Sequence, residues 1–130
     1  MIDKFKKYLI VAAHPDDDVL GCGGTLKKLS KLKKNVRVIF IAEGSSCRFT
    51  NYEKYKKKIS KTINQREEYA KKALLDLGLK NSSFYNLMCG KLNKYPITEI
   101  SRSPNVKRLP TTLTGISSPT LILRKHFLFT

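Results

Sequence analysis

Short continuous apolar runs alternate with longer segments of helical spacing over the first hundred positions of the chain. Continuous apolar runs rich in β-forming residues, at 8–13 and 36–42, predict buried strands, and the stretch 83–87 predicts a third. Leucines at helical spacing predict a helix from 19 to about 34, and a longer helix is expected from about 52 to 77, before Gly78. Because strands alternate with helices, the pattern predicts an α/β fold: a Rossmann-like parallel sheet with flanking helices and right-handed crossovers.

Residues 101–130 differ from the rest of the chain. They contain neither Asp nor Glu, they hold three of the five prolines, and no helical or alternating pattern is sustained. A chain of 130 residues suits one compact domain. We therefore expect one α/β domain over 1–100, shortened relative to a full sheet, and a divergent, irregular tail over 101–130. Three interpretations of the tail stay open: an extended segment packed on the core, a disordered tail, and a change of reading frame near Ile100.

The chain is strongly basic, with 26 Lys and Arg against 10 Asp and Glu and a formal net charge of +16. These lysines are spread over several polar segments without an RNP or helix-turn-helix signature, so nucleic acid is not an expected partner. The apolar runs are too short to span a bilayer, and no signal peptide is visible. Three cysteines without a C-x-x-C pair fit thiols in a reducing compartment, so we expect a cytoplasmic protein.

The densest group of candidate ligands directly follows the first predicted strand. His14, Asp16, Asp17 and Asp18 stand within five residues, where the strand ends and the helix begins. Ligands of open α/β sheets bind beyond the carboxyl ends of the strands, and an imidazole beside carboxylates offers the mixed donors that zinc uses. The alternative is that Asp17 or Asp18 only caps the helix. One acid is enough for a cap, whereas three acids repel one another unless a cation is present, so we favour a metal site.

Arg66 interrupts the apolar stripe of the second predicted helix. It lies three residues after Ile63 and four before Ala70, on the side expected to face the core. A guanidinium there needs partners, because burying it unpaired is costly. The ordinary interpretation is an ion pair with a carboxylate of the site, or a side chain that reaches solvent at the edge of the stripe. The functional interpretation is a donor fork for a sugar hydroxyl or a phosphate.

The run Ala13-His14-Pro15-Asp16-Asp17-Asp18, with Gly21-Cys22-Gly23-Gly24-Thr25 after it, resembles the signature of the PIG-L/LmbE-like deacetylases. In that signature Glu is more common at the position of Asp18. Members of this family are zinc-dependent enzymes that remove the N-acetyl group from N-acetylglucosamine-type sugars and conjugates. The resemblance therefore implies a Zn²⁺ cofactor bound by His14 and Asp17, with Asp16 as the general base and a small amino sugar as the substrate.

Further stretches resemble the family in the same order along the first hundred residues. They are 41–46, the helical segment from Arg66 to Gly78, and 84–100. The resemblance implies that Arg66 binds substrate, and it makes Glu43 and Ser45, which follow the second strand, further substrate-binding candidates. Cys89 stands where relatives commonly carry an acid.

One part of the family's site is not evident in this sequence. The family's third zinc ligand is a histidine beyond a fourth strand, and His126, the second of two histidines here, lies in a context that does not resemble it. Zinc sites usually take three or four protein ligands, so we expect an N-deacetylase that is impaired in this shortened or degenerate form. The alternative is a non-catalytic remnant that binds a sugar or polyanion through Arg66 and its basic surface. A homo-oligomeric assembly stays open.

Overall fold

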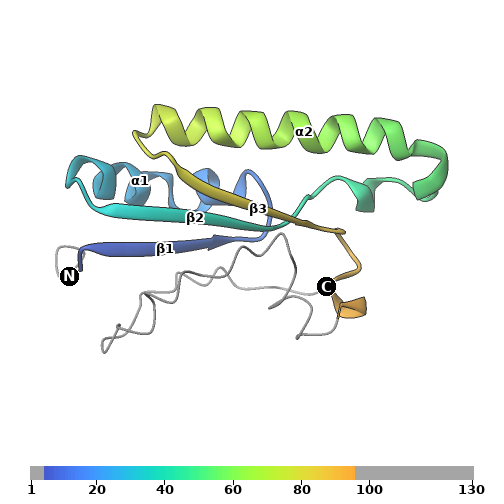
Figure 1. Ribbon diagram of the computed structural model, residues 1–130, viewed down its shortest axis with the longest axis horizontal. Helices are drawn as coiled ribbons and strands as arrows, with labels where there is room; N and C mark the ends of the chain where they lie inside the picture. The colour runs from blue at the N-terminus through green and yellow to red at the C-terminus, as the bar shows by residue number, and fades with distance from the viewer. Residues whose placement is uncertain (1–4, 96–130) are drawn as a thin grey trace.

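The computed structural model of the chain describes residues 5–95 (Figure 1). Three strands alternate with two helices: β1 (Lys7–Ala12), α1 (Asp17–Lys31), β2 (Asn35–Ala42), α2 (Tyr52–Asp76) and β3 (Asn81–Leu87). Two short 3-10 helices, η2 (Ser46–Arg48) and η3 (Leu92–Lys94), follow β2 and β3. The α/β order predicted from the sequence is therefore confirmed, while the predicted tail at 101–130 lies outside the described residues.

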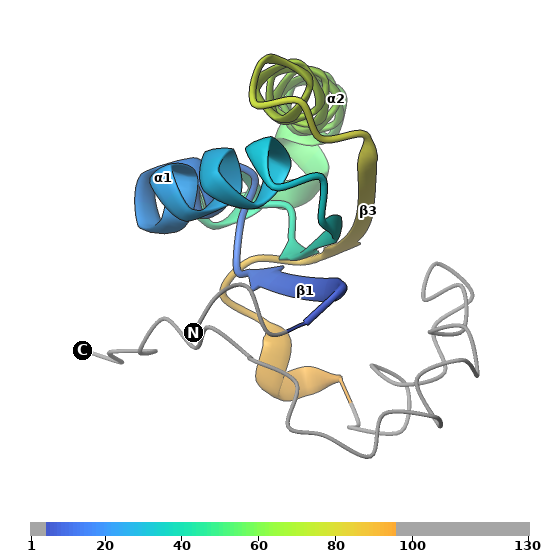
Figure 2. The ribbon, with the colours of Figure 1, turned by 90° about the vertical axis from the view of Figure 1, so that its left-hand side faces the viewer.

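The three strands form one parallel sheet in the order β1-β2-β3. Ile10 pairs with Val38 in the first ladder, and Ile39 pairs with Ser83 in the second. Parallel neighbours need crossover connections, and α1 and α2 supply them on the same face of the sheet (Figure 2). Because all the strands run in the same direction, the loops that follow β1, β2 and β3 leave the sheet at one end.

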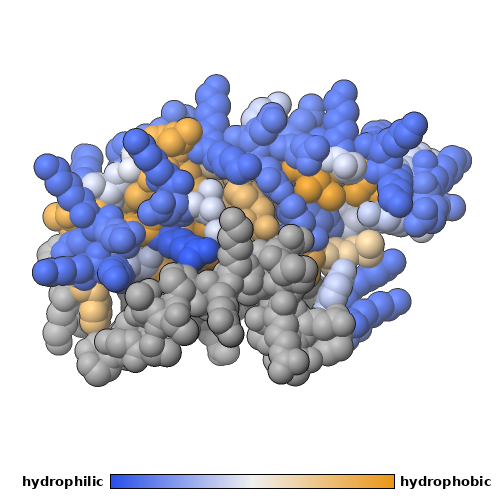
Figure 3. Space-filling model, in the orientation of Figure 1, coloured by the Kyte–Doolittle hydropathy of each residue, from blue (hydrophilic) through white to orange (hydrophobic). Residues whose placement is uncertain are grey.

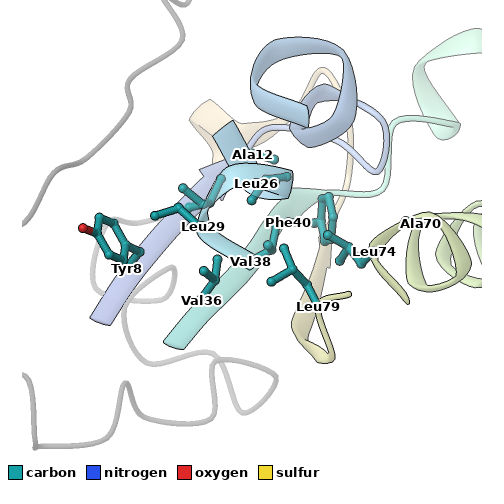
Figure 4. Packing of buried hydrophobic residues seen from close by; sticks show 11 residues of the cluster. Tyr8, Ala12, Leu26, Leu29, Val36, Val38, Phe40, Ala70, Leu74 and Leu79 are labelled. Atoms are coloured by element: carbon teal, nitrogen blue, oxygen red, sulfur yellow. The ribbon is translucent and has the colours of Figure 1, made fainter. Parts of the chain in front are cut away.

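The main core lies between the sheet and the two helices (Figure 4). Side chains alternate along a strand, so every second residue of β2, including Val38 and Phe40, points toward the helices and is buried. Phe40 also stacks on Phe84 of β3, with ring centroids 4.6 Å apart. The buried cluster consists of Tyr8, Ile10, Ala12, Leu26, Leu29, Val36, Val38, Phe40, Ala70, Leu74 and Leu79. This packing holds both helices against the sheet and fixes where the three loops begin.

Helix α1 begins two residues before the predicted start and contains a kink. The backbone of Cys22 is non-helical, with φ −148° and ψ 21°, and the neighbouring glycines have low helix propensity. Asp16 occupies the N-cap position without a side-chain capping bond, and Asp17 and Asp18 lie in the first turn. The helix dipole favours negative charge there. Because α1 begins where β1 ends, all three acids lie at the end of the sheet where the loops meet.

Helix α2 begins at Tyr52, where the sequence pattern predicts it. The side-chain oxygen of Asn51 caps it by accepting a hydrogen bond from the backbone N–H of Lys54 (3.0 Å). Hydrophilic side chains cover most of the outer surface of this helix (Figure 3), and Ile59, Ala70 and Leu74 are its buried residues. Within residues 5–95, neither helix is long and apolar enough to cross a membrane.

Replacing Gly78 tests the turn between α2 and β3. Gly78 has φ +84°, and a Cβ built there would lie 2.5 Å from Ser30 Oγ. We expect Gly78→Ala to lower the free energy of unfolding by about 1–3 kcal/mol, because alanine is strained in the left-handed region. Urea denaturation measures the change.

Gly24→Ala is the matched control, because a Cβ at Gly24 meets nothing within 4 Å. Alanine has a higher helix propensity than glycine, so the free energy of unfolding of this variant should rise by about 0.5–1 kcal/mol. Equal stability of the two variants would contradict the turn geometry described for Gly78.

Candidate active site

Three loops meet where the strands of the sheet end. The backbone N–H of Ala42 donates to the carbonyl oxygen of Ala13, which follows β1 (2.8 Å). The N–H of Glu43 donates to the carbonyl oxygen of Leu87, the last residue of β3 (3.1 Å). These bonds continue the pairing of the strands beyond the regular sheet. The segments that begin at Ala13, at Glu43 and after Leu87 therefore lie side by side.

A buried carboxylate joins two of these segments. Glu43 is only 2% exposed, and its Oε2 accepts hydrogen bonds from the backbone N–H groups of Ser45 (2.5 Å) and Ser46 (2.9 Å). Its Oε1 accepts bonds from the Ser46 hydroxyl and from the backbone N–H of Cys89 (2.8 Å). Since the serines follow β2 and Cys89 follows β3, the Glu43 side chain fixes the two loops relative to each other. We call this set of bonds the Glu43 clamp.

The charge of Glu43 is stabilised by these bonds. Burial acts to raise the pKa of Glu43, but the hydrogen bonds from Cys89, Ser46 and Ser45 together outweigh it, so the pKa lies below its ordinary value. Ser45 is also buried, and its hydroxyl donates to the backbone oxygen of Glu43 (3.4 Å). The two candidate substrate-binding residues of this loop are thus enclosed by protein, and substrate contact by either one stays a prediction.

His14 and Asp17 face each other at the start of α1. The imidazole Nδ1 lies 3.4 Å from Asp17 Oδ2, and the same oxygen accepts a hydrogen bond from the backbone N–H of His14 (3.1 Å). Both side chains are about one-third exposed, at 33% and 28%. Two donors bound to one tetrahedral zinc ion at their usual bond lengths lie about 3.3–3.6 Å apart. The separation and the donor types therefore fit a shared cation.

The Nε2 edge of the His14 ring contacts a sulfur atom. His14 Nε2 lies 3.4 Å from Cys89 Sγ. A thiol can accept a hydrogen bond from Nε2 or donate one to it, so the contact is compatible with a proton on Nε2 that leaves the lone pair of Nδ1 toward Asp17. Burial raises the pKa of the Cys89 thiol to about 12, with contributions from the neighbouring Cys47 thiol and the Glu43 charge and with an opposing one from Arg66. Cys89 is therefore a neutral thiol near neutral pH, suited to orient the imidazole.

Asp16, at the start of α1, pairs with Arg66 of α2. Arg66 Nη2 donates to Asp16 Oδ2 at 3.0 Å, and the Asp16 side chain is 49% exposed while that of Arg66 is 18% exposed. Gly44, with φ +68°, lies against both groups of the site. A Cβ there would come within 3.0 Å of His14 Cδ2 and 3.1 Å of Arg66 Nη2. Glycine at this position therefore leaves room for the imidazole and the guanidinium.

Asp18 has a different environment from the other two acids. It is 1% exposed, and neither of its carboxylate oxygens has a hydrogen-bond partner in the part of the chain that the structure describes. Burial raises the pKa of Asp18; the N–H groups of Val19 and of Asp18 itself oppose the rise, and the charges of Asp16 and Asp17 add to it. Asp18 is therefore enclosed by protein, whereas Asp16 and Asp17 are accessible to solvent.

The structure brings together the residues that the sequence grouped at this site. His14, Asp17 and Asp16 lie at one end of α1, and the ion pair with a site carboxylate, which was one of the interpretations of Arg66, is present. Across residues 5–95, no three His, Cys, Asp or Glu side chains are arranged to hold one metal ion. His126, considered as a third ligand from the sequence, lies outside the described residues.

Some features of the site have little or no signal in the sequence. The contact of Cys89 with His14 depends on where the third loop lies, and the N–H groups that bind Glu43 are backbone atoms that no residue type reveals. A glycine directly after Glu43 was the available signal for the close packing at Gly44, because glycine allows both positive φ and close approach.

The Glu43 clamp is tested by Glu43→Gln. A Gln amide has one acceptor oxygen where the carboxylate has two, so donors from one of the loops lose their partner. We therefore expect the free energy of unfolding to fall by about 1–3 kcal/mol at pH 7. Urea denaturation measures this difference.

The wild-type protein and the Glu43→Gln variant should respond differently to acid. Because the pKa of Glu43 is lower in the folded state, its contribution is complete above the unfolded pKa, near 4.5, and is lost as the pH falls through the folded value. The Gln variant should lack this loss. Identical pH profiles for the two proteins between about pH 3 and pH 7 would show that the clamp contributes nothing to the folded state.

Comparisons with known proteins identify a family. Residues 9–116 match the family described as PIG-L: GlcNAc-PI de-N-acetylase, and the matched range includes His14, Asp16, Asp17, Glu43, Ser45 and Arg66. No curated protein is similar enough to count as a match.

One similar solved structure is that of N,N′-diacetylchitobiose deacetylase from Pyrococcus horikoshii in complex with its inhibitor. It is 28% identical in sequence with a TM-score of 0.57, over 67% of this chain and 31% of that chain. The present chain thus spans about a third of the length of that deacetylase. Since the family match covers most of the chain and includes the His14–Asp18 cluster, the chain belongs to the PIG-L de-N-acetylase family.

Proposed function

We propose that this protein is a zinc-dependent hydrolase that removes the N-acetyl group from an N-acetylglucosamine-type sugar or conjugate. Membership of a de-N-acetylase family supports the class of reaction. The similar structure, by its printed name, is a deacetylase of a diacetylated sugar. The observation that carries the proposal is the approach of His14 Nδ1 to Asp17 Oδ2, with the accessible Asp16 carboxylate in the adjoining position.

His14 and Asp17 are the residues that we assign to the zinc ion. Their 3.4 Å separation fits a shared cation, and Cys89 Sγ beside Nε2 is compatible with the tautomer that leaves Nδ1 free. Zinc supplies Lewis acidity toward water and toward an amide carbonyl oxygen. A further protein ligand has to come from beyond the described range, with His126 as one candidate, or from a second copy of the chain. The expected impairment of the activity therefore stays a prediction.

Asp16 is the residue that we assign to proton transfer. Its carboxylate is accessible to solvent, and it is adjacent in sequence to the proposed ligand Asp17. As general base, Asp16 removes a proton from the water that attacks the acetyl carbonyl carbon. The same carboxyl group then delivers a proton to the amine nitrogen as the bond between carbon and nitrogen breaks. The reaction yields acetate and a free amino sugar.

Arg66 positions the Asp16 carboxylate through their ion pair. Nη2 is occupied by Asp16 Oδ2, and the remaining guanidinium donors at the outer end of the side chain supply a fork for a sugar hydroxyl or a phosphate. Glu43 and Ser45 remain substrate-binding candidates in this proposal. Their contacts support a second contribution, which is to hold the loop that carries Gly44 against His14 and Arg66.

A matched pair of variants tests the separate assignments of Asp16 and Asp17. Asp16→Asn removes the base while keeping the shape of the side chain, so we expect release of free amine from N-acetylated sugars to fall by about 10²–10⁴-fold with zinc content unchanged. Asp17→Asn removes a charged ligand, so both zinc content and activity should be lost. The readouts are an amine-specific fluorescence assay and elemental analysis of the purified proteins.

The outcomes separate the enzyme from the non-catalytic alternative. Activity of Asp16→Asn within about tenfold of the wild type removes Asp16 from the role of base. If the unmodified chain holds no zinc and releases no amine, the interpretation as a remnant that binds a sugar or polyanion through Arg66 is favoured instead.

A further inference from the structure

Two of the three cysteines meet between the loops of the site. Cys47 lies in η2 after β2, and Cys89 lies two residues after the end of β3. A Cβ built at Gly90, the neighbour of Cys89, would lie 3.6 Å from Cys47 Cβ, so the two loops touch at this level. The two cysteines therefore belong to loops that lie against each other.

The Glu43 clamp keeps the two cysteines next to each other. Glu43 binds the N–H of Ser46, which precedes Cys47 in the chain, and it also binds the N–H of Cys89 itself. One buried carboxylate therefore fixes the backbone beside both thiols. Such fixed proximity raises the rate of a reaction between two groups far above that of the same groups free in solution.

We propose that Cys47 and Cys89 form a thiol-modification site that reacts with low-molecular-weight disulfides and becomes an intramolecular disulfide across the two loops. Cys47 is exposed and is the thiol that such a reagent reaches first, whereas Cys89 is partly buried against His14. The proposal does not depend on zinc or on deacetylation. It concerns a covalent change beside His14 that follows from the placement of the loops.

The reaction proceeds by two thiol–disulfide exchanges. The Cys47 thiolate attacks one sulfur of the reagent, its S–S bond breaks, and one thiol of the reagent leaves. Cys89 then loses its proton to solvent and attacks Cys47 Sγ, and the second reagent thiol leaves. The two cysteines are oxidised by two electrons, and the reagent disulfide is reduced to two thiols. The second step is intramolecular, because the Glu43 clamp holds the two loops together.

Cys22 provides an internal comparison. Its thiol donates to the carbonyl oxygen of Asp18 within α1 (3.1 Å), and the side chain packs against the main core. Cys22 and Cys47 are separated by 25 positions, whereas Cys47 and Cys89 are separated by 42. In an unfolded chain the shorter loop closes more readily, so the pair Cys22–Cys47 is favoured about twofold over Cys47–Cys89. The folded structure reverses this preference.

The disulfide would also change the surroundings of His14. Cys89 Sγ, which now lies 3.4 Å from His14 Nε2, becomes covalently bonded to a residue of the neighbouring loop. The oxidised and reduced proteins thus differ in the group that contacts the imidazole.

Oxidised glutathione added to the reduced full-length protein tests the proposal. After alkylation of the remaining thiols and tryptic digestion without reductant, we expect one cross-linked product of the peptides 38–48 and 81–91, which dithiothreitol separates. The peptide 8–27, which contains Cys22, should be recovered alkylated. Cys22→Ser should give the same product, and Cys47→Ser should give none.

The same treatment in guanidinium chloride is the control for folding. There we expect the cross-links to shift toward Cys22–Cys47, by about the twofold factor of loop closure. If the native protein gives the same distribution of cross-links as the denatured protein, or only glutathione adducts of Cys47, the proposal is wrong.

Discussion

The Glu43 carboxylate accepts hydrogen bonds from the loop that follows β2 and from the loop that follows β3, and it does so while almost fully buried. A buried charge is costly unless hydrogen bonds satisfy it, so the two loops and the carboxylate stabilise one another. The loop after β2 carries Gly44, which touches His14 and Arg66, and the loop after β3 carries Cys89, which touches the other side of the His14 ring. The orientation of the imidazole therefore depends on Glu43 through the two loops that this carboxylate joins.

Three consecutive aspartates at the start of α1 have three different environments. Asp16 is accessible and paired with Arg66, Asp17 faces the His14 ring, and Asp18 is buried without a described hydrogen-bond partner. The turn into α1 separates them, because successive residues of a helix point in different directions. Three residues of the same type thus have different surroundings because of the backbone. This is the physical basis for assigning one of them to proton transfer and another to a cation.

The order of strands and helices could be predicted because its signals are local: continuous apolar runs for β1 and β2, helical spacing of leucines for α1, and Gly78 after α2. The early start and the kink of α1 were not predicted, since they depend on a glycine-rich segment that packing holds helical on both sides of Cys22. The place of Arg66 on an apolar stripe indicated that it needs a partner, and an ion pair with a site carboxylate was one of the interpretations that it left open. In contrast, neither the burial of Glu43 nor the contact of Cys89 with His14 could be predicted, because both depend on where segments far apart in the chain come together.

We propose that His14 and Asp17 hold a zinc ion while Cys89 stays outside its coordination shell. X-ray absorption spectroscopy at the zinc edge, on the full chain loaded with zinc under reducing conditions, distinguishes these ligands. We expect a first shell of nitrogen and oxygen at about 2.0–2.2 Å with the outer scattering of an imidazole ring. A sulfur shell at about 2.3 Å, or a chain that retains no zinc at all, would contradict it.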